Sequence, residues 1–257
     1  MTESNKSKRI YHDFETKTKD VGYFQRTIGE FLMPFVIKDN VDKYDKLYTK
    51  GHDHLYPNID LVRLEKRYLT SKNNNILDYG FGSGESLIHL IKLGYDAYGI
   101  EASQKAIELV SKKMKERNIP KEKIKLFKLN ESDKKIPFKD AFFDNIICMS
   151  VLSLLQTKEN AALLINEFYR ILKPEGKLII DINGPEAAFK TKGKFISDDE
   201  FQSKVREGIY VNTYCPKNVD IFSRLLNKFQ IDELGEVKFK YFDIIEHEFI
   251  ACVRKIK

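Results

Sequence analysis

Three glycines and two acidic residues lie close together in the stretch ILDYGFGSGESLIHLIKLGYDAYGIEAS. Gly80, Gly82 and Gly84 occupy alternate positions. Asp78 precedes them, and Glu101 follows about twenty residues later. Glycines between a strand and a helix let the backbone turn sharply and approach a ligand without a Cβ in the way. The following helix adds free N–H groups and a partial positive charge, so the stretch predicts a ligand-binding turn.

The acidic residues indicate which ligand this turn holds. A dinucleotide site has the pattern G-x-G-x-x-G and seats a pyrophosphate on the helix terminus. Here the glycine spacing is one residue shorter, and Asp78 repels a pyrophosphate but suits a ligand with an ammonium group. Glu101 is placed to accept hydrogen bonds from both hydroxyls of a ribose. Adenosine with an amino-acid tail meets both requirements, whereas a purely structural turn explains only the glycines.

Alternating strands and helices surround the turn. Strands are predicted over residues 75–79, 96–102, 123–129, 143–149 and 177–182, and helices over residues 85–93, 103–117 and 158–172. This alternation predicts a parallel sheet that is covered by helices on both faces and joined by right-handed crossovers.

The two ends of the chain depart from this rhythm. Helices are predicted over 23–32, 58–69 and 219–229, with a tyrosine-rich connector between the first two, and strands over 230–242 and 246–255 that pair antiparallel at a sheet edge. An insertion at 183–218 is predicted to hold one short helix, because Ser197 and Glu200 form a capping-box pattern. We expect residues 1–70 to form an N-terminal extension and residues 71–257 to form the main domain.

Four stretches in order resemble the class I S-adenosylmethionine-dependent methyltransferases. ILDYGFGSG is similar to the first motif of that family and YGIEAS to its ribose-binding strand. IPFKDAFFDNIICMSVLSLL and EFYRILKPEGKLIIDI resemble the segments around its fourth and fifth strands, so the resemblance covers about residues 75–181. It implies a doubly wound, Rossmann-like α/β fold with a mostly parallel seven-stranded sheet, an antiparallel C-terminal hairpin and a helical N-terminal lid. It also implies methyl transfer from S-adenosylmethionine.

The resemblance implies a set of cofactor-binding positions. They are Asp78, Gly80, Phe81, Gly82, Glu101, Ala102, Met149 and Ser150, although the family usually has a small or polar residue where Phe81 stands, and Met149 and Ser150 equally suit packing at a strand end. The contact to the adenine amino group stays open among residues 130–133, with Asn130 or Glu131 favoured. Arg63 is a candidate partner for the carboxylate of the cofactor, or the site of a surface salt bridge.

Candidates for a general base are His52, His54 and Asp181. The two histidines resemble half of a metal site, but no third ligand is apparent, so we expect no metal. The tyrosines of the connector, Tyr44, Tyr48 and Tyr56, resemble the lid over the cofactor and substrate in small-molecule members of the family.

Charge and motifs narrow the choice of methyl acceptor. The net charge is +6, and 44 basic residues are interleaved with 38 acidic ones, which argues against a nucleic-acid partner. The chain after FDNIICM lacks the Asn/Asp-Pro-Pro-Tyr/Phe motif of many enzymes that methylate planar nitrogens. The aromatic lid and the insertion favour a small metabolite, methylated on oxygen rather than nitrogen. The alternatives are a non-catalytic cofactor-binding protein of the same fold and an RNA or protein methyltransferase.

The sequence also bears on the location of the protein. No apolar run approaches the ~18–20 residues of a membrane span, and the N-terminus is polar, without the apolar core of a secretion signal. Cys148, Cys215 and Cys252 lie too far apart for a zinc knuckle or a disulfide framework. We therefore expect a cytoplasmic protein without a membrane partner.

Overall fold

The computed structural model describes residues 35–69, 71–72, 74–187, 194–197, 200–206, 209–242 and 244–257. All of them belong to one unit of the chain, Met33–Lys257. The helix predicted over residues 23–32 lies outside the described residues.

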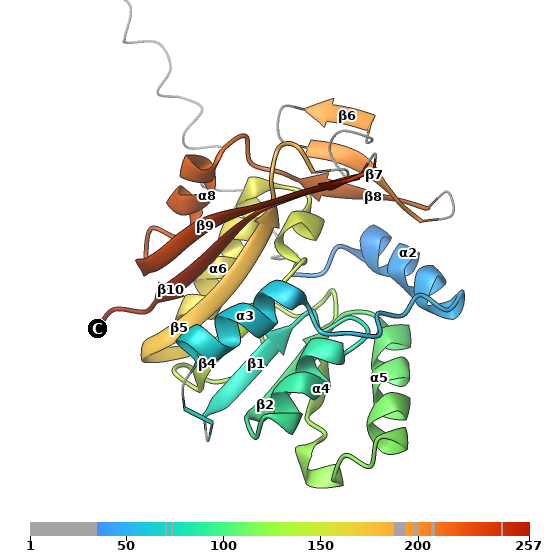
Figure 1. Ribbon diagram of the computed structural model, residues 1–257, viewed down its shortest axis with the longest axis vertical. Helices are drawn as coiled ribbons and strands as arrows, with labels where there is room; N and C mark the ends of the chain where they lie inside the picture. The colour runs from blue at the N-terminus through green and yellow to red at the C-terminus, as the bar shows by residue number, and fades with distance from the viewer. Residues whose placement is uncertain are drawn as a thin grey trace, which may run out of the picture. The chain divides into compact units, whose positions relative to one another are not determined.

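A seven-stranded sheet forms the centre of the fold (Figure 1). Its strands, in spatial order, are β3 (Leu126–Lys128), β2 (Asp96–Glu101), β1 (Asn75–Tyr79), β4 (Phe143–Cys148), β5 (Leu172–Asn183), β10 (Ile244–Arg254) and β9 (Gln230–Tyr241). The first five run parallel, and β10 is antiparallel to both of its neighbours. The predicted mostly parallel sheet with an antiparallel C-terminal hairpin is confirmed.

Helices cover both faces of the sheet. On one face pack α3 (Ile59–Tyr68), α4 (Glu85–Lys92) and α5 (Gln104–Glu116), and on the other α6 (Lys158–Ile171) and α8 (Val219–Leu225). Because strand side chains alternate between faces, Ile179 packs with the first group and its neighbours Leu178 and Ile180 with the second. None of the described helices is long and apolar enough to cross a membrane.

A helix that the sequence analysis missed precedes α3. Residues Lys38–Thr49 form α2, whereas we predicted a connector there. Val41, Tyr44, Leu47 and Tyr48 recur at spacings of three, six and seven residues, which is a helical period among many charged residues. Leu47 is buried, so this side of α2 packs inward.

The insertion forms a small antiparallel sheet of its own. Its strands are β6 (Lys194–Ser197), β7 (Glu200–Arg206) and β8 (Ile209–Tyr214). The helix predicted from the Ser197 and Glu200 capping-box pattern is wrong, because these two residues face each other where β6 and β7 pair. The run IYVNTY of β8 is rich in β-branched and aromatic residues, which favour a strand, and the insertion forms strands where one short helix was predicted.

Candidate functional site

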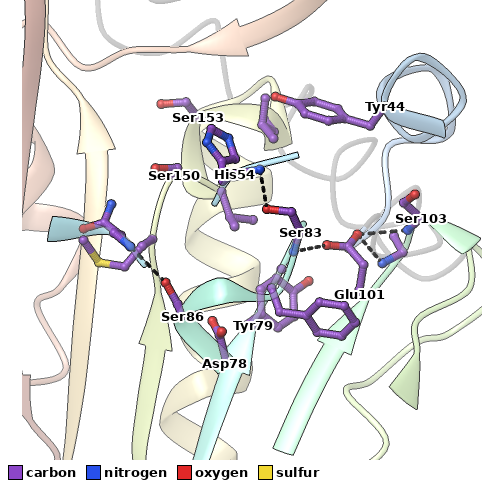
Figure 2. Close-up of a pocket in the computed structure, with 18 of the residues that line it drawn as sticks. Tyr44, His54, Asp78, Tyr79, Ser83, Ser86, Glu101, Ser103, Ser150 and Ser153 are labelled. Carbon is purple, nitrogen blue, oxygen red and sulfur yellow. Dashed lines mark hydrogen bonds between the residues drawn. The ribbon is translucent and has the colours of Figure 1, made fainter. Parts of the chain in front are cut away.

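A cavity of about 610 Å³ opens at the carboxyl ends of the parallel strands. This is where ligands bind in open α/β sheets. Its wall combines the glycine turn after β1, the end of β2, the segment after β4, part of α2 and the connector that follows α2, together with Asn183 of β5 and Glu246 and Glu248 of β10. Figure 2 shows Asp78, Ser86 and Glu101 on one side of this space and Tyr44, His54 and Ser153 on the other.

The turn after β1 depends on glycine for different reasons at different positions. Gly80, Gly82 and Gly84 all have positive φ, between +53° and +80°. A Cβ on Gly84 would lie 2.4 Å from Val110, so this glycine lets α4 pack against α5. A Cβ on Gly82 would meet the hydroxyl oxygen of Tyr48 at 3.0 Å, so the glycine lets α2 approach the turn.

Glu101 is held at the end of β2 by three backbone N–H groups. Its Oε1 accepts hydrogen bonds from Ala102 N at 2.7 Å and Ser103 N at 2.9 Å, and its Oε2 accepts one from Gly82 N at 3.0 Å. Removal from water raises the pKa of Glu101, although these hydrogen bonds oppose the shift. The acid and the glycine turn are therefore part of one hydrogen-bonded structure.

Asp78 is a buried acid in the wall of the cavity. Its side chain is 4% exposed and lines the cavity, and its Oδ2 has no hydrogen-bond partner among the described residues. Burial, with a smaller contribution from Glu101, raises the pKa of Asp78 to about 7. A buried carboxylate without a partner is costly, so a cationic ligand group at this position would stabilise its charged form.

An aromatic group from α2 and the following connector covers the turn. Tyr44 and Tyr48 have ring centroids 6.3 Å apart, Tyr48 and His52 5.5 Å, and His52 and His54 4.9 Å. All four line the cavity. Burial raises the pKa of Tyr44 to about 12 and that of Tyr48 well above its ordinary value, so both hydroxyls stay protonated.

Polar contacts fasten this covering group to the sheet. The buried side chain of Asn40 donates to Leu154 O at 2.8 Å and Asn212 O at 2.9 Å, and it accepts from Asn212 N at 3.2 Å. Farther along α2, Asp45 accepts hydrogen bonds from the Ser103 hydroxyl and from Lys105 N. α2 is thus joined both to the inserted sheet and to the start of α5.

The connector after α2 is anchored to the glycine turn by a charged cluster. Lys113 contacts Asp53 and Glu85, and it also donates to the carbonyl oxygens of Ser83 and His54 at 3.0 and 3.3 Å. The run of charged residues around Lys113 is typical of a solvated helix face, yet the Lys113 side chain is only 8% exposed. A lysine in a charged run carries no sequence signal of a distant buried partner.

The segment after β4 contains a residue with a strained backbone, Ser150, in the wall of the cavity. Ser150 has a φ of +59°, which is uncommon outside glycine, and its N–H donates to Asp181 Oδ1 at 2.6 Å. Met149 and Ser150 line the cavity, as do Phe81 and Ala102. Asp181 is 1% exposed and lies behind Ser150 rather than in the wall.

Three residues that were predicted to bind the cofactor lie outside the cavity wall. Asn130 is exposed and donates from its backbone N–H to Asp133 at 2.7 Å. Glu131 lies 3.6 Å from Lys38 at the start of α2, also in solvent. Arg63 donates to Asp60 Oδ1 at 3.1 Å, with its side chain 60% exposed. No described group of three or more His, Cys, Asp or Glu side chains could hold a metal ion.

Comparison with known proteins decides between the ligands that this geometry allows. Residues 77–180, from β1 through most of β5, match the family model of a methyltransferase domain. These residues therefore form a methyltransferase domain. It is 27% identical to the putative methyltransferase YqeM of Bacillus subtilis over 135 residues, which are 49% of this chain and 52% of that protein. The chain spans about half the length of the curated relatives it matches.

Solved structures share the fold of this methyltransferase domain. An S-adenosylmethionine-dependent methyltransferase of Methanosarcina mazei aligns with a TM-score of 0.59 at 21% identity, covering 80% of this chain and 99% of that one. A Burkholderia thailandensis 1,6-didemethyltoxoflavin-N1-methyltransferase, solved with its substrate and S-adenosylhomocysteine, has a TM-score of 0.59 at 13% identity and covers 85% and 88%.

The residues of this methyltransferase domain suit S-adenosylmethionine. The unpartnered Oδ2 of Asp78 suits an ammonium group, and Glu101, which lines the cavity, suits the hydroxyls of a ribose. Without Cβ atoms, Gly80 and Gly82 leave room for a ligand along the turn. The domain therefore has an acceptor for each polar end of the cofactor on one side of the cavity.

Binding of the cofactor is expected to release protons near neutral pH. The pKa of Asp78 is about 7 in the free protein, and an ammonium partner lowers it because the ionised carboxylate is then favoured. Affinity for S-adenosylhomocysteine should therefore rise with pH from about 5 to about 8. Calorimetry in buffers of different ionisation enthalpy measures the proton release directly.

The variant Asp78→Asn is the control for this linkage. It keeps the shape of the side chain but cannot titrate, so its affinity should be lower and less dependent on pH. Glu101 contributes a change of the same sign, because its pKa is also raised. Equal binding heats in all buffers for the unmodified protein would show that Asp78 does not meet the ammonium group.

Proposed function

We propose that this protein transfers the methyl group of S-adenosylmethionine to a small metabolite held in the cavity. The proposal depends on one observation: Asp78, whose Oδ2 has no described partner, and Glu101 lie on either side of a glycine turn. This turn belongs to the domain that matches the methyltransferase family model. Two acceptors for a cofactor occupy one side of a cavity whose opposite side carries aromatic and polar side chains. We assign this opposite side to the methyl acceptor.

Methyl transfer does not require the protein to form a covalent bond to either ligand, because the cofactor supplies the reactive group. When bound, S-adenosylmethionine supplies a methyl group that moves to the acceptor as its bond to sulfur breaks. The residues of the chain orient the acceptor and exclude water. Tyr44, Ser150 and Ser153 line the cavity wall, and we assign this role to them.

We assign oxygen rather than nitrogen as the methylated atom. A hydroxyl loses its proton on methylation, so it benefits from a nearby base. His52 and His54 line the cavity. The backbone N–H of His54 donates a hydrogen bond to Ser83 Oγ, with 3.1 Å between nitrogen and oxygen, which fixes the backbone of His54. His54 is our first candidate to receive the proton, because Asp181 lies behind the wall.

We also assign a lid function to α2 and the connector after it. Asn40 and Asp45 fasten α2 through hydrogen bonds, and few of its side chains are buried. Segments held mainly by polar contacts open at low free-energy cost. Opening here exposes the glycine turn and admits both ligands. The proposed lid is the described part of the predicted N-terminal extension, and we assign residues 71–257 to the catalytic domain.

Methyl transfer into a cell extract tests the proposed function. The purified protein is incubated with extract and methyl-labelled S-adenosylmethionine, and the label is followed in low-mass, RNA and protein fractions. We expect time-dependent label in the low-mass fraction that added S-adenosylhomocysteine suppresses. Label in the RNA or protein fraction would overturn the small-molecule assignment. Cofactor binding with no transfer to any fraction would favour a non-catalytic binding protein.

A further inference from the structure

One end of the cavity is unusually acidic. Glu246 and Glu248 are two residues apart on β10, so their side chains leave the same face of the sheet. Both line the cavity, and Glu248 pairs directly with Asn183, a third wall residue, across the β5–β10 ladder. This acidic end is formed by different strands from those that provide Asp78 and Glu101.

Two further acids lie behind this end. Asp181 is two residues before Asn183 on β5, on the same face, and is 1% exposed. Asp60, in the first turn of α3, is 8% exposed on the helix that covers this face. The charge of Glu248 acts on Asp181, and the charge of Asp60 acts on both, so the carboxylates are close together.

These acids have too few cationic partners within the part of the chain that the structure describes. Arg63 donates to Asp60, but its side chain is 60% exposed. Neither Glu246 nor Glu248 forms an ion pair with any described side chain. The buried Oδ2 of Asp181 has no described hydrogen-bond partner either.

Burial and close spacing raise the pKa values of two of these acids. Burial and the neighbouring acids raise the pKa of Glu248 to about 7, and that of Asp181 well above its ordinary value. Glu246 is exposed and Glu248 is partly buried, but Asp181 and Asp60 behind them are buried. Placing Glu248 beside buried carboxylates is unfavourable unless a proton or a cation offsets their charge. An arrangement of this kind at the rim of a binding cavity is suited to a positively charged ligand group.

Given the proposed function, we propose that the methyl acceptor carries an organic cation, an ammonium or guanidinium group, that is bound by Glu246 and Glu248. This group is separate from the hydroxyl that is methylated, and its binding orients the acceptor. Tyr56 and Pro57, which also line the cavity, provide apolar contact for the rest of the molecule. Glu246 and Glu248 are then specificity-determining residues.

A series of phenols that differ in charge tests this proposal. Tyramine, tyrosol and 4-hydroxyphenylacetate have the same phenol ring and carry an ammonium, a neutral hydroxyl and a carboxylate. Their binding to the full chain is measured by ligand-observed magnetic resonance, with and without S-adenosylhomocysteine, at about pH 8, which is above the pKa of about 7 of Glu248. We expect tyramine to bind best, by at least about tenfold over 4-hydroxyphenylacetate.

Substitutions locate the origin of this preference. Glu248→Gln and Glu246→Gln should each reduce tyramine binding, by roughly tenfold for Glu248→Gln, without changing the affinity for S-adenosylhomocysteine. Glu233→Gln is the matched control, because it removes an exposed carboxylate from the neighbouring strand β9, outside the cavity wall. This control should bind all probes as the unmodified chain does.

Each other outcome overturns the inference in a recognisable way. Tyramine binding that is no stronger than that of 4-hydroxyphenylacetate, or that is unchanged in Glu248→Gln, would exclude an organic-cation site. Weaker binding of S-adenosylmethionine alone in Glu248→Gln would instead assign the acids to the sulfonium of the cofactor. If S-adenosylhomocysteine fails to bind at all, the proposed function fails, while the probe series in the cofactor-free protein still decides the cation site.

Discussion

Replacing Gly80 with valine is expected to abolish binding of S-adenosylmethionine and S-adenosylhomocysteine. Gly80 has a φ of +71°, and a Cβ there would lie 2.4 Å from a Cγ atom of Val151, which also lines the cavity. The turn must therefore shift, or Val151 must move into the space of the ligand. We expect the affinity measured by calorimetry to fall at least about a hundredfold, equal to about 3 kcal/mol.

The variant should remain folded, so the loss can be attributed to the site. A left-handed backbone costs a side chain roughly 1–2 kcal/mol, against a total stability of about 5–15 kcal/mol. Gly94→Val is the matched control, because Gly94 has a φ of +97° and open space around its Cβ. It should lose comparable stability in thermal unfolding and keep its cofactor affinity. Full affinity in Gly80→Val would mean that the turn is only structural.

The clash at Gly80 illustrates what could be predicted from the sequence. Strand, glycine turn and helix follow from local patterns, and the distance from Asp78 to Glu101 along the chain places them at neighbouring strand ends. The sequence predicts that a side chain at position 80 either occupies the space of the ligand or forces the turn open. The structure shows that Val151, from a segment far along the chain, is met first. Such contacts carry no local signal.

The misassigned segments share a physical cause. α2 has a helical period, but its many charged residues weaken the pattern, and its partners Leu154 and Asn212 are distant in sequence. Lys113 is surrounded by other lysines in the sequence, and its burial depends on Glu85 and Asp53. Contacts with residues that are distant in the sequence determine these placements, and a single sequence does not show which residues will be in contact. The acidic end of the cavity was missed for the same reason.

Replacing Glu101 with alanine is expected to weaken binding of S-adenosylhomocysteine by roughly 1–3 kcal/mol, the range for lost charge-assisted hydrogen bonds. The carboxylate is already oriented by the N–H groups of Gly82, Ala102 and Ser103, so it needs little rearrangement to accept two ribose hydroxyls. Glu108→Ala, which removes an exposed carboxylate from α5 outside the cavity wall, should have no effect.

A truncated ligand separates the roles of the two acids. Methylthioadenosine keeps the ribose of S-adenosylhomocysteine but has no amino-acid tail. Glu101→Ala should therefore weaken both ligands by the same factor, whereas Asp78→Asn should weaken only S-adenosylhomocysteine, because only that ligand offers an ammonium group to the unpartnered Oδ2. Calorimetry of the two variants with the two ligands gives the four values needed. If Glu101→Ala spares methylthioadenosine, the ribose is held elsewhere, and the acid at the end of β2 serves only to fix the glycine turn through Gly82.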